Sequence, residues 1–148
     1  MKRLNYLYLG LLLVFLMSCE RDHVETTTGS LQRWYSLEQV EEGKVLFLRH
    51  CTVCHGEEAQ GLTQEWMKRD ASGNFPAPPL NGTAHAWHHP LPILDQVIAE
   101  GGIPLGGTMP GFSAQLDERD RQLTVAYFQS FWSDEIYESW QTINNRQK

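Results

Sequence analysis

Cys51-Thr52-Val53-Cys54-His55 is the stretch of sequence that decides the fold. Its two cysteines stand three positions apart and a histidine follows the second directly, which is the spacing of covalent haem c attachment. Each thiol can form a thioether with one vinyl group, and the adjacent imidazole can present a nitrogen to the iron. A structural disulfide or a redox dithiol could use the same cysteines, whereas zinc would need further ligands and the chain has no second cysteine pair. The pattern therefore predicts one covalently bound haem.

Length and charge limit the classes of protein that the chain can belong to. It has 148 residues, of which 41% are hydrophobic and 20% charged, and its net charge is −6 at pH 7. The length suits one small domain, and the composition is not that of a disordered polymer. The acidic balance argues against nucleic acid as a partner, because binding phosphates needs a basic surface.

The first residues have the features of an export signal. Lys2 and Arg3 precede an apolar run at 7–17, which is shorter than the roughly 20 residues of a membrane-spanning helix. Such a run fits the core of a secretory signal peptide. The residues after the run favour a lipoprotein signal. The alternatives are a plain signal peptide and an uncleaved anchor.

The run ends in Leu16-Met17-Ser18-Cys19, which looks like a bacterial lipobox with Cys19 as the lipidated residue. Residues 1–18 are then the signal peptide and 19–35 a lipidated N-terminus and flexible tether. Cleavage would remove Lys2 and Arg3 and leave a net charge of −8. The predicted location is the periplasmic side of a bacterial membrane, held there by the lipid.

A helix is predicted to begin after Ser36, because Ser36 and Gln39 form a capping box. One face of this helix carries Leu37, Val40, Gly43 and Phe47. A glycine within a helix costs about 1 kcal/mol relative to alanine. Its place on the apolar face predicts a close crossing with a second helix.

Met109 is the candidate for a second iron ligand. It lies in Gly106-Gly107-Thr108-Met109-Pro110, and glycine and proline predict a stiff irregular loop that can lay a thioether over a flat ring. Met67, the other methionine of the mature chain, stands in a highly polar stretch. A buried loop hydrophobe is the alternative role for Met109.

These features together resemble class I cytochrome c of the small bacterial exported type, over residues 36–132. The resemblance rests on the first helix, the Cys51–His55 motif, Pro78-x-Leu80-x-Gly82, the Met109-Pro110 loop and a closing helix. It implies an all-α fold in which helices wrap one haem and the first and last helices cross, with Tyr127 packed over Gly43.

The resemblance also implies roles for five residues. Cys51 and Cys54 would carry the thioethers, His55 would be the proximal ligand and Met109 the distal one. Pro78 would offer its carbonyl to the other nitrogen of His55, as ligating imidazoles usually require.

The rest of the chain predicts further helices. An apolar stripe at 93–98 follows Pro92 and stops at Gly101, and Asp117 is a plausible N-cap for a helix running to Trp132. Residues 133–148 would form a C-terminal helical extension with an apolar face, and 65–75 a short helix with a surface loop.

Three histidines lie within five residues, at His85, His88 and His89. A copper site is conceivable there, because histidine is a common transition-metal ligand. The alternative, which we prefer, is a polar loop near the haem propionates.

The expected function is that of an electron carrier, not an enzyme: a monomer that exchanges single electrons with redox proteins of a respiratory chain. The alternatives are a haem- or copper-binding assembly module, a subunit of a larger oxidoreductase, or a haem peroxidase, which would need an open position on the iron.

Overall fold

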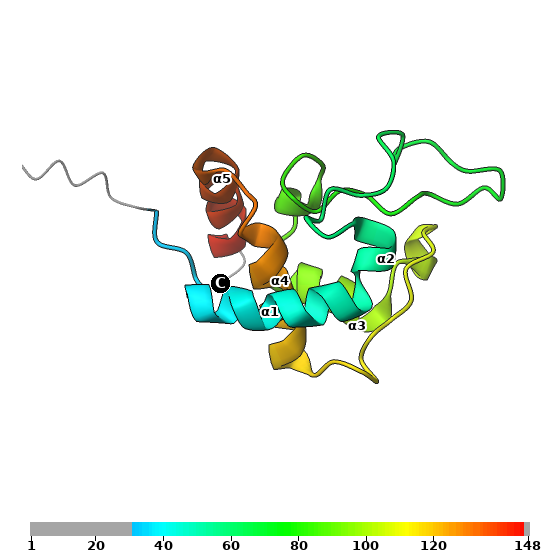
Figure 1. Ribbon diagram of the computed structural model, residues 1–148. Coiled ribbons are helices and arrows are strands. Elements are labelled where there is room, and N and C mark those ends of the chain that lie inside the picture. The colour runs from blue at the N-terminus through cyan, green and yellow to red at the C-terminus, as the bar shows by residue number, and fades with distance from the viewer. Residues whose placement is uncertain (1–30, 147–148) are drawn as a thin grey trace, which may run out of the picture. The chain divides into compact units, whose positions relative to one another are not determined.

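The computed structural model describes residues 31–146 and is built from helices (Figure 1). This part of the chain has no strand, only an isolated bridge between Phe75 and Gly107. No helix within it is long and apolar enough to cross a membrane. The predicted signal peptide and Cys19 lie outside the described residues. The elements are α1 (Leu37–His50), α2 (Thr52–His55), η1 (Ala86–His88), α3 (Leu91–Glu100), η2 (Ile103–Leu105), α4 (Glu118–Gln129) and α5 (Asp134–Asn145).

The first helix begins where its capping box predicts. Ser36 Oγ accepts from the amide of Gln39 at 3.2 Å, and Gln39 Oε1 accepts from the amide of Ser36 at 2.9 Å. Val40 and Phe47 are buried on the predicted face, whereas Leu37, at the first position of that face, is 86% exposed. Helical periodicity predicts the direction in which a side chain points. It does not predict whether a neighbouring helix extends far enough to cover that side chain.

Helices α1 and α4 cross at Gly43, as predicted (Figure 1). A Cβ added to Gly43 would lie 2.6 Å from the carbonyl carbon of Leu123, and closer still to its oxygen. Tyr127 packs beside the glycine, and its ring lies 5.1 Å from that of Phe47. Only a glycine therefore allows the two backbones to approach this closely.

Helix α3 is tied to α4 by a charged pair. The guanidinium of Arg121 donates to both carboxylate oxygens of Asp95, at 2.9 and 3.1 Å, and also to the carbonyl of Leu116 at 2.9 Å. Both charged side chains are largely buried. The fork geometry of this pair fixes the direction of α3 against α4.

Helix α5 packs against the segment that precedes α1. The Tyr137 hydroxyl accepts from the amide of Trp34 at 2.8 Å, and Arg33 forms an ion pair with Asp134 at 2.7 Å. Residues 31–35, which the sequence predicts to be flexible tether, are therefore part of the folded body. Large aromatic side chains explain this: the Tyr35 ring packs on that of Tyr137 in α5 with centres 6.2 Å apart, and this contact removes apolar surface from water.

Two predicted boundaries also differ. Residues 65–75 form turns and no helix, because the Asp70 carboxylate accepts from the amides of Ser72 and Asn74 and so favours a local turn. Helix α4 ends at Gln129 and not at Trp132, and the Ser130 hydroxyl bonds the carbonyl of Tyr127 at 2.7 Å.

Candidate functional site

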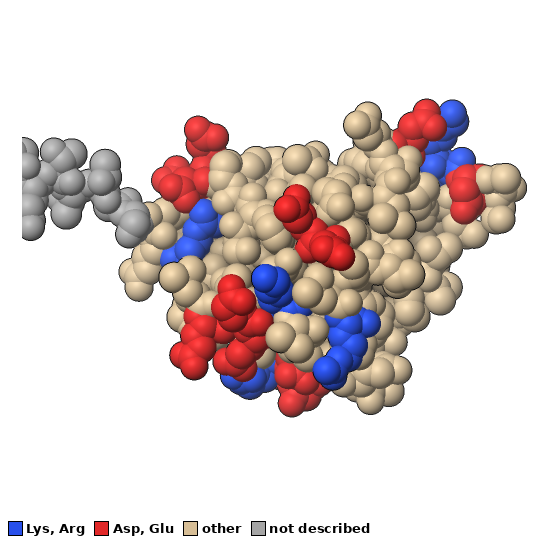
Figure 2. Space-filling model, viewed as in Figure 1, with Lys and Arg blue, Asp and Glu red and all other residues tan. Residues whose placement is uncertain are grey.

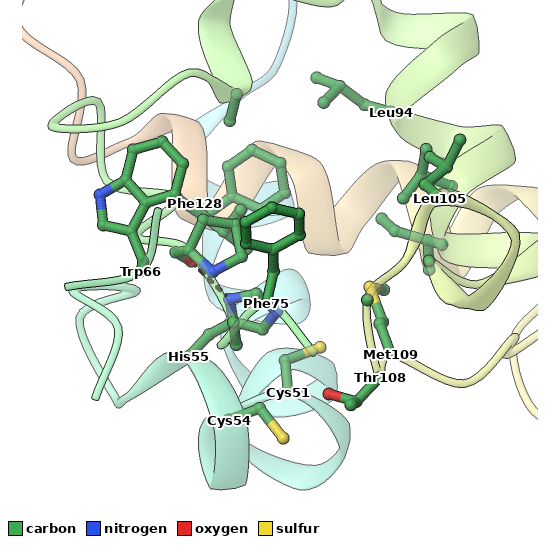
Figure 3. Close-up of a pocket in the computed structure, with 18 of the residues that line it drawn as sticks. Cys51, Cys54, His55, Trp66, Phe75, Leu94, Leu105, Thr108, Met109 and Phe128 are labelled. Carbon is green, nitrogen blue, oxygen red and sulfur yellow. Dashed lines mark hydrogen bonds between the residues drawn. The ribbon is translucent and has the colours of Figure 1, made fainter. Parts of the chain in front are cut away.

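A cavity of about 700 Å³ lies next to the Cys51–His55 stretch (Figure 3). Its wall is mostly apolar, with Phe47, Phe75, Leu94 and Phe128 among the lining side chains. The volume lies within the range of roughly 300–1,000 Å³ that is typical of small-molecule and cofactor sites. The lining draws on α1, α2, α3 and α4 and on the loops between them, so the fold is arranged around this space.

The two cysteines reach the cavity from one helical turn. Helix α1 ends at His50, Cys51 is its C-cap, and α2 continues the chain through Cys54. Residues three apart on such a turn project to the same side. Cys51 is buried and Cys54 exposed, and burial raises the pKa of the Cys51 thiol to about 12. Without a cofactor the Cys51 thiol is therefore a neutral group at pH 7.

His55 is held in one orientation. Its ring is buried, and Nδ1 lies 2.9 Å from the carbonyl oxygen of Pro78, drawn as a dashed line in Figure 3. Because a carbonyl can only accept, Nδ1 carries the proton and Nε2 keeps its lone pair. Burial lowers the pKa of His55, so the ring is a neutral imidazole that can act as a ligand.

Met109 lies across the cavity from His55 (Figure 3). Its loop is pinned to the end of α3, because the amide of Gly102 donates to the Met109 carbonyl at 2.9 Å. Gly101 has a φ of 88°, and a Cβ there would lie 2.6 Å from that same carbonyl. Met67 also reaches the cavity wall, but it is 72% exposed and comes from the loop at 63–75. The two candidate thioethers thus differ in burial, because Met109 is partly buried against the core whereas Met67 is largely exposed.

The lining includes no Asp, Glu, Lys or Arg among the described residues. Besides the cysteines, its titratable side chains are histidines: His50, His55, His85 and His89. His88 is not among them, and its ring packs on Trp87 at 3.8 Å. Within residues 31–146 no group of three His, Cys, Asp or Glu side chains is arranged to hold a metal ion.

Sequence reasoning missed several residues of the wall. Trp66 and Phe75 come from the loop between α2 and η1, where no periodicity marks them as buried. Phe75 is placed by its amide, which donates to the carbonyl of Gly106 at 3.4 Å, and by Arg69, whose guanidinium lies 4.0 Å from the ring centre. The bond to Gly106 joins segments that are far apart in sequence, and the contact with Arg69 depends on the conformation of the loop. No local sequence signal predicts either contact.

Comparison with known families gives one result. The family described as cytochrome c oxidase, cbb3-type, subunit III, matches residues 38–128, which is more than half of the chain. The chain belongs to this family. It is a class I cytochrome c with a predominantly helical cytochrome c domain, as the sequence predicted. No curated protein and no solved structure matches the chain.

A cytochrome c domain implies haem c, and the cavity fits that group. Two thiols stand side by side at its edge, one imidazole presents a free Nε2, and the remaining wall is apolar. All these residues fall within the matched range, whereas α5 and residues 31–35 lie outside it.

Proposed function

We propose that this class I cytochrome c is a membrane-tethered, periplasmic mono-haem protein that transfers single electrons between respiratory redox partners. The observation that carries the proposal is the cavity itself, with the Cys51–His55 stretch on one wall and Met109 on the opposite one. In this proposal Cys51 and Cys54 carry the thioethers, and His55 and Met109 are the axial ligands. The lipid anchor at Cys19 is proposed from the sequence alone.

Bound haem would supply a one-electron iron couple, and the protein controls it through four kinds of contact. The Pro78 carbonyl holds the His55 ring and strengthens it as a donor, because the shared proton makes Nε2 more basic. Met109 offers a soft neutral thioether, which favours the reduced iron. The apolar wall keeps water away and so lowers the local dielectric constant. The cysteines prevent loss of the group during repeated oxidation and reduction.

Partner binding would have an electrostatic component. The predicted mature charge is −8, and Figure 2 shows acidic side chains on several parts of one face, with Lys and Arg between them. Such a surface favours partners with a basic docking face and an association rate that falls as salt rises, because screening shortens the range of the attraction.

A second function is a fixed subunit of a larger oxidase, favoured by the description of the matching family. Purification of the full-length protein from membranes in mild detergent separates the two. A mobile carrier elutes alone at the mass of the lipidated chain, whereas a subunit elutes with an oxidase of larger mass and keeps a constant ratio to it.

The haem assignment is tested by extracting the purified protein with acid acetone. Covalent haem stays with the chain, and haemochrome absorbance should give one haem per polypeptide. Cys51→Ser combined with Cys54→Ser should release it, while Cys19→Ser serves as a matched control that loses a cysteine and keeps the haem. Release of haem from the wild-type protein would show that the proposal is wrong.

A further inference from the structure

Two of the histidines in the cavity wall form a pair that the proposed iron ligands leave without a function. The rings of His85 and His89 lie 5.6 Å apart and nearly perpendicular, and both line the cavity. Trp66 stacks on His85 with ring centres 5.2 Å apart and planes inclined by 22°. Figure 3 shows Trp66 away from Cys51 and Cys54, so this pair belongs to a different edge of the cavity from the thiols.

Helix α5 holds the backbone of this pair. The indole of Trp140, itself 1% exposed, donates to the carbonyl of His89 at 2.9 Å. Two residues further along, the amide of Leu91 donates to Asn144 Oδ1 at 2.9 Å. These bonds lie on either side of Pro90, which restricts the backbone between them. The loop is thus held by residues of α5, a helix that lies outside the range that matches the family.

Among the described residues, the only charged groups that shift the pKa values of this pair are neighbouring histidines, and no carboxylate contributes. Burial is the main cause that lowers the pKa of both His85 and His89, and the neighbouring histidines, His88 among them, lower it further. The charged groups nearest along the Trp66 loop, Glu65 and Lys68, form an ion pair with each other at 3.4 Å. From α5 the contact is the neutral Trp140. An anion placed beside the two rings would therefore meet no competing carboxylate among the described residues.

Haem carries two carboxylates, on the edge of the ring away from the vinyl groups that cysteines attach. The cavity wall has no Lys or Arg among the described residues to receive them, and the histidines are its only cationic candidates. His55 is already bonded to Pro78, and His50 lies in edge contact with Phe112. We propose that His85 and His89 form a carboxylate-binding edge of the cavity, held in position by Trp140 and Asn144 of α5.

This inference rests on the proposed function, because it needs the haem to be bound. A carboxylate beside the pair stabilises the imidazolium form. Reduction of the iron removes one positive charge nearby and stabilises it further, so electron uptake and proton uptake are coupled. The midpoint potential should then fall as pH rises through the histidine range, from about 5 to 8. Each tenfold difference in proton affinity between the two redox states corresponds to about 59 mV.

The test is a spectroelectrochemical titration of the purified haem-loaded protein between pH 5 and 8. The double variant His85→Gln and His89→Gln keeps hydrogen-bonding side chains that do not titrate, and it should lose most of the fall. His88→Gln, which changes a histidine of the same loop that does not line the cavity, should retain it. Trp140→Phe keeps an aromatic ring, removes the bond to His89, and should displace the pH range of the fall.

The outcomes separate this inference from the proposed function. An unchanged fall in the double variant, an equal loss in His88→Gln, or a wild-type potential that does not vary with pH overturns the carboxylate-binding edge. A Trp140→Phe profile identical to wild type overturns the positioning role of α5. In each case the haem stays covalently attached, so the proposed function stands. Extraction of the haem by acid acetone would show that both the proposed function and the carboxylate-binding edge are wrong.

Discussion

Replacing Gly43 by alanine should weaken the domain at the crossing of α1 and α4. The added Cβ would lie 2.6 Å from the Leu123 carbonyl carbon, where non-bonded carbons prefer at least about 3.5 Å. The helices would have to separate by at least about 0.9 Å to restore that distance, and by more to clear the carbonyl oxygen, which lies closer still. The obstacle is main chain, so no side-chain rotation can relieve it.

The size of the effect follows from two opposing contributions. Overpacking a well-packed contact costs roughly 1–3 kcal/mol, and a clash with backbone belongs at the upper end. Alanine recovers about 1 kcal/mol, because it is a better helix former than glycine. The net loss in the free energy of unfolding should be about 2 kcal/mol.

The assay is denaturant unfolding of the haem-loaded protein, followed by far-UV circular dichroism. Lys44→Ala is the matched control, since it introduces the same residue at the next, exposed position of α1 and should leave the midpoint nearly unchanged. Combining Gly43→Ala with Tyr127→Ala should not restore stability, because the tightest contact is with Leu123 backbone. A Gly43→Ala midpoint equal to or above the wild-type value would refute the close-crossing argument.

Three further outcomes follow from named residues. Met109→Ala should abolish the near-infrared sulfur-to-iron charge-transfer band and lower the midpoint potential, whereas Met67→Ala should keep both; the reverse result would exchange their roles. Cys19→Ala should block lipidation, and a variant whose mass and membrane partition equal those of wild type would contradict the lipobox. Trp132→Phe should destabilise the protein by about 1–3 kcal/mol in denaturant unfolding, because the partly buried carbonyl of Leu80 loses the buried indole donor at 2.7 Å; an unchanged midpoint would mean that water replaces the donor.

The parts of the fold that local chemistry encodes could be predicted from sequence. A serine and a glutamine three residues apart are enough to begin α1, and Asp117 begins α4 by accepting from the amide of Asp120 at 2.8 Å. The Cys51–His55 stretch predicts the family because thioether chemistry fixes the spacing. The crossing at Gly43 was also predictable, since a glycine on an apolar helical face removes the side chain that would keep a second backbone away.

The parts that could not be predicted depend on long-range contacts. The sequence predicts Trp34 to be part of the tether, but hydrogen bonds to Gln129 and Tyr137, about a hundred residues later, hold it against the core. The cavity wall draws Phe75 from a loop whose position is set by Gly106. Contacts between such distant residues are decided by tertiary structure, so the composition and periodicity of a short stretch of sequence do not predict them.

The packing of residues 31–35 against α5 brings the two ends of the folded body together. Gln141 of α5 donates through its side-chain amide to the carbonyl of Gln32 at 3.1 Å, so the described chain begins and ends at neighbouring points. A module with adjacent borders can be inserted into a surface loop of another protein, or permuted by joining its ends, without moving its interior. Here the haem cavity begins at the far end of α1, about 21 Å along a 14-residue helix from the capping box. Fusions made before residue 31 and after α5 keep that helix and its bonds to His89 and Leu91 in place, so they should leave the redox site intact and allow the domain to be transplanted as a unit.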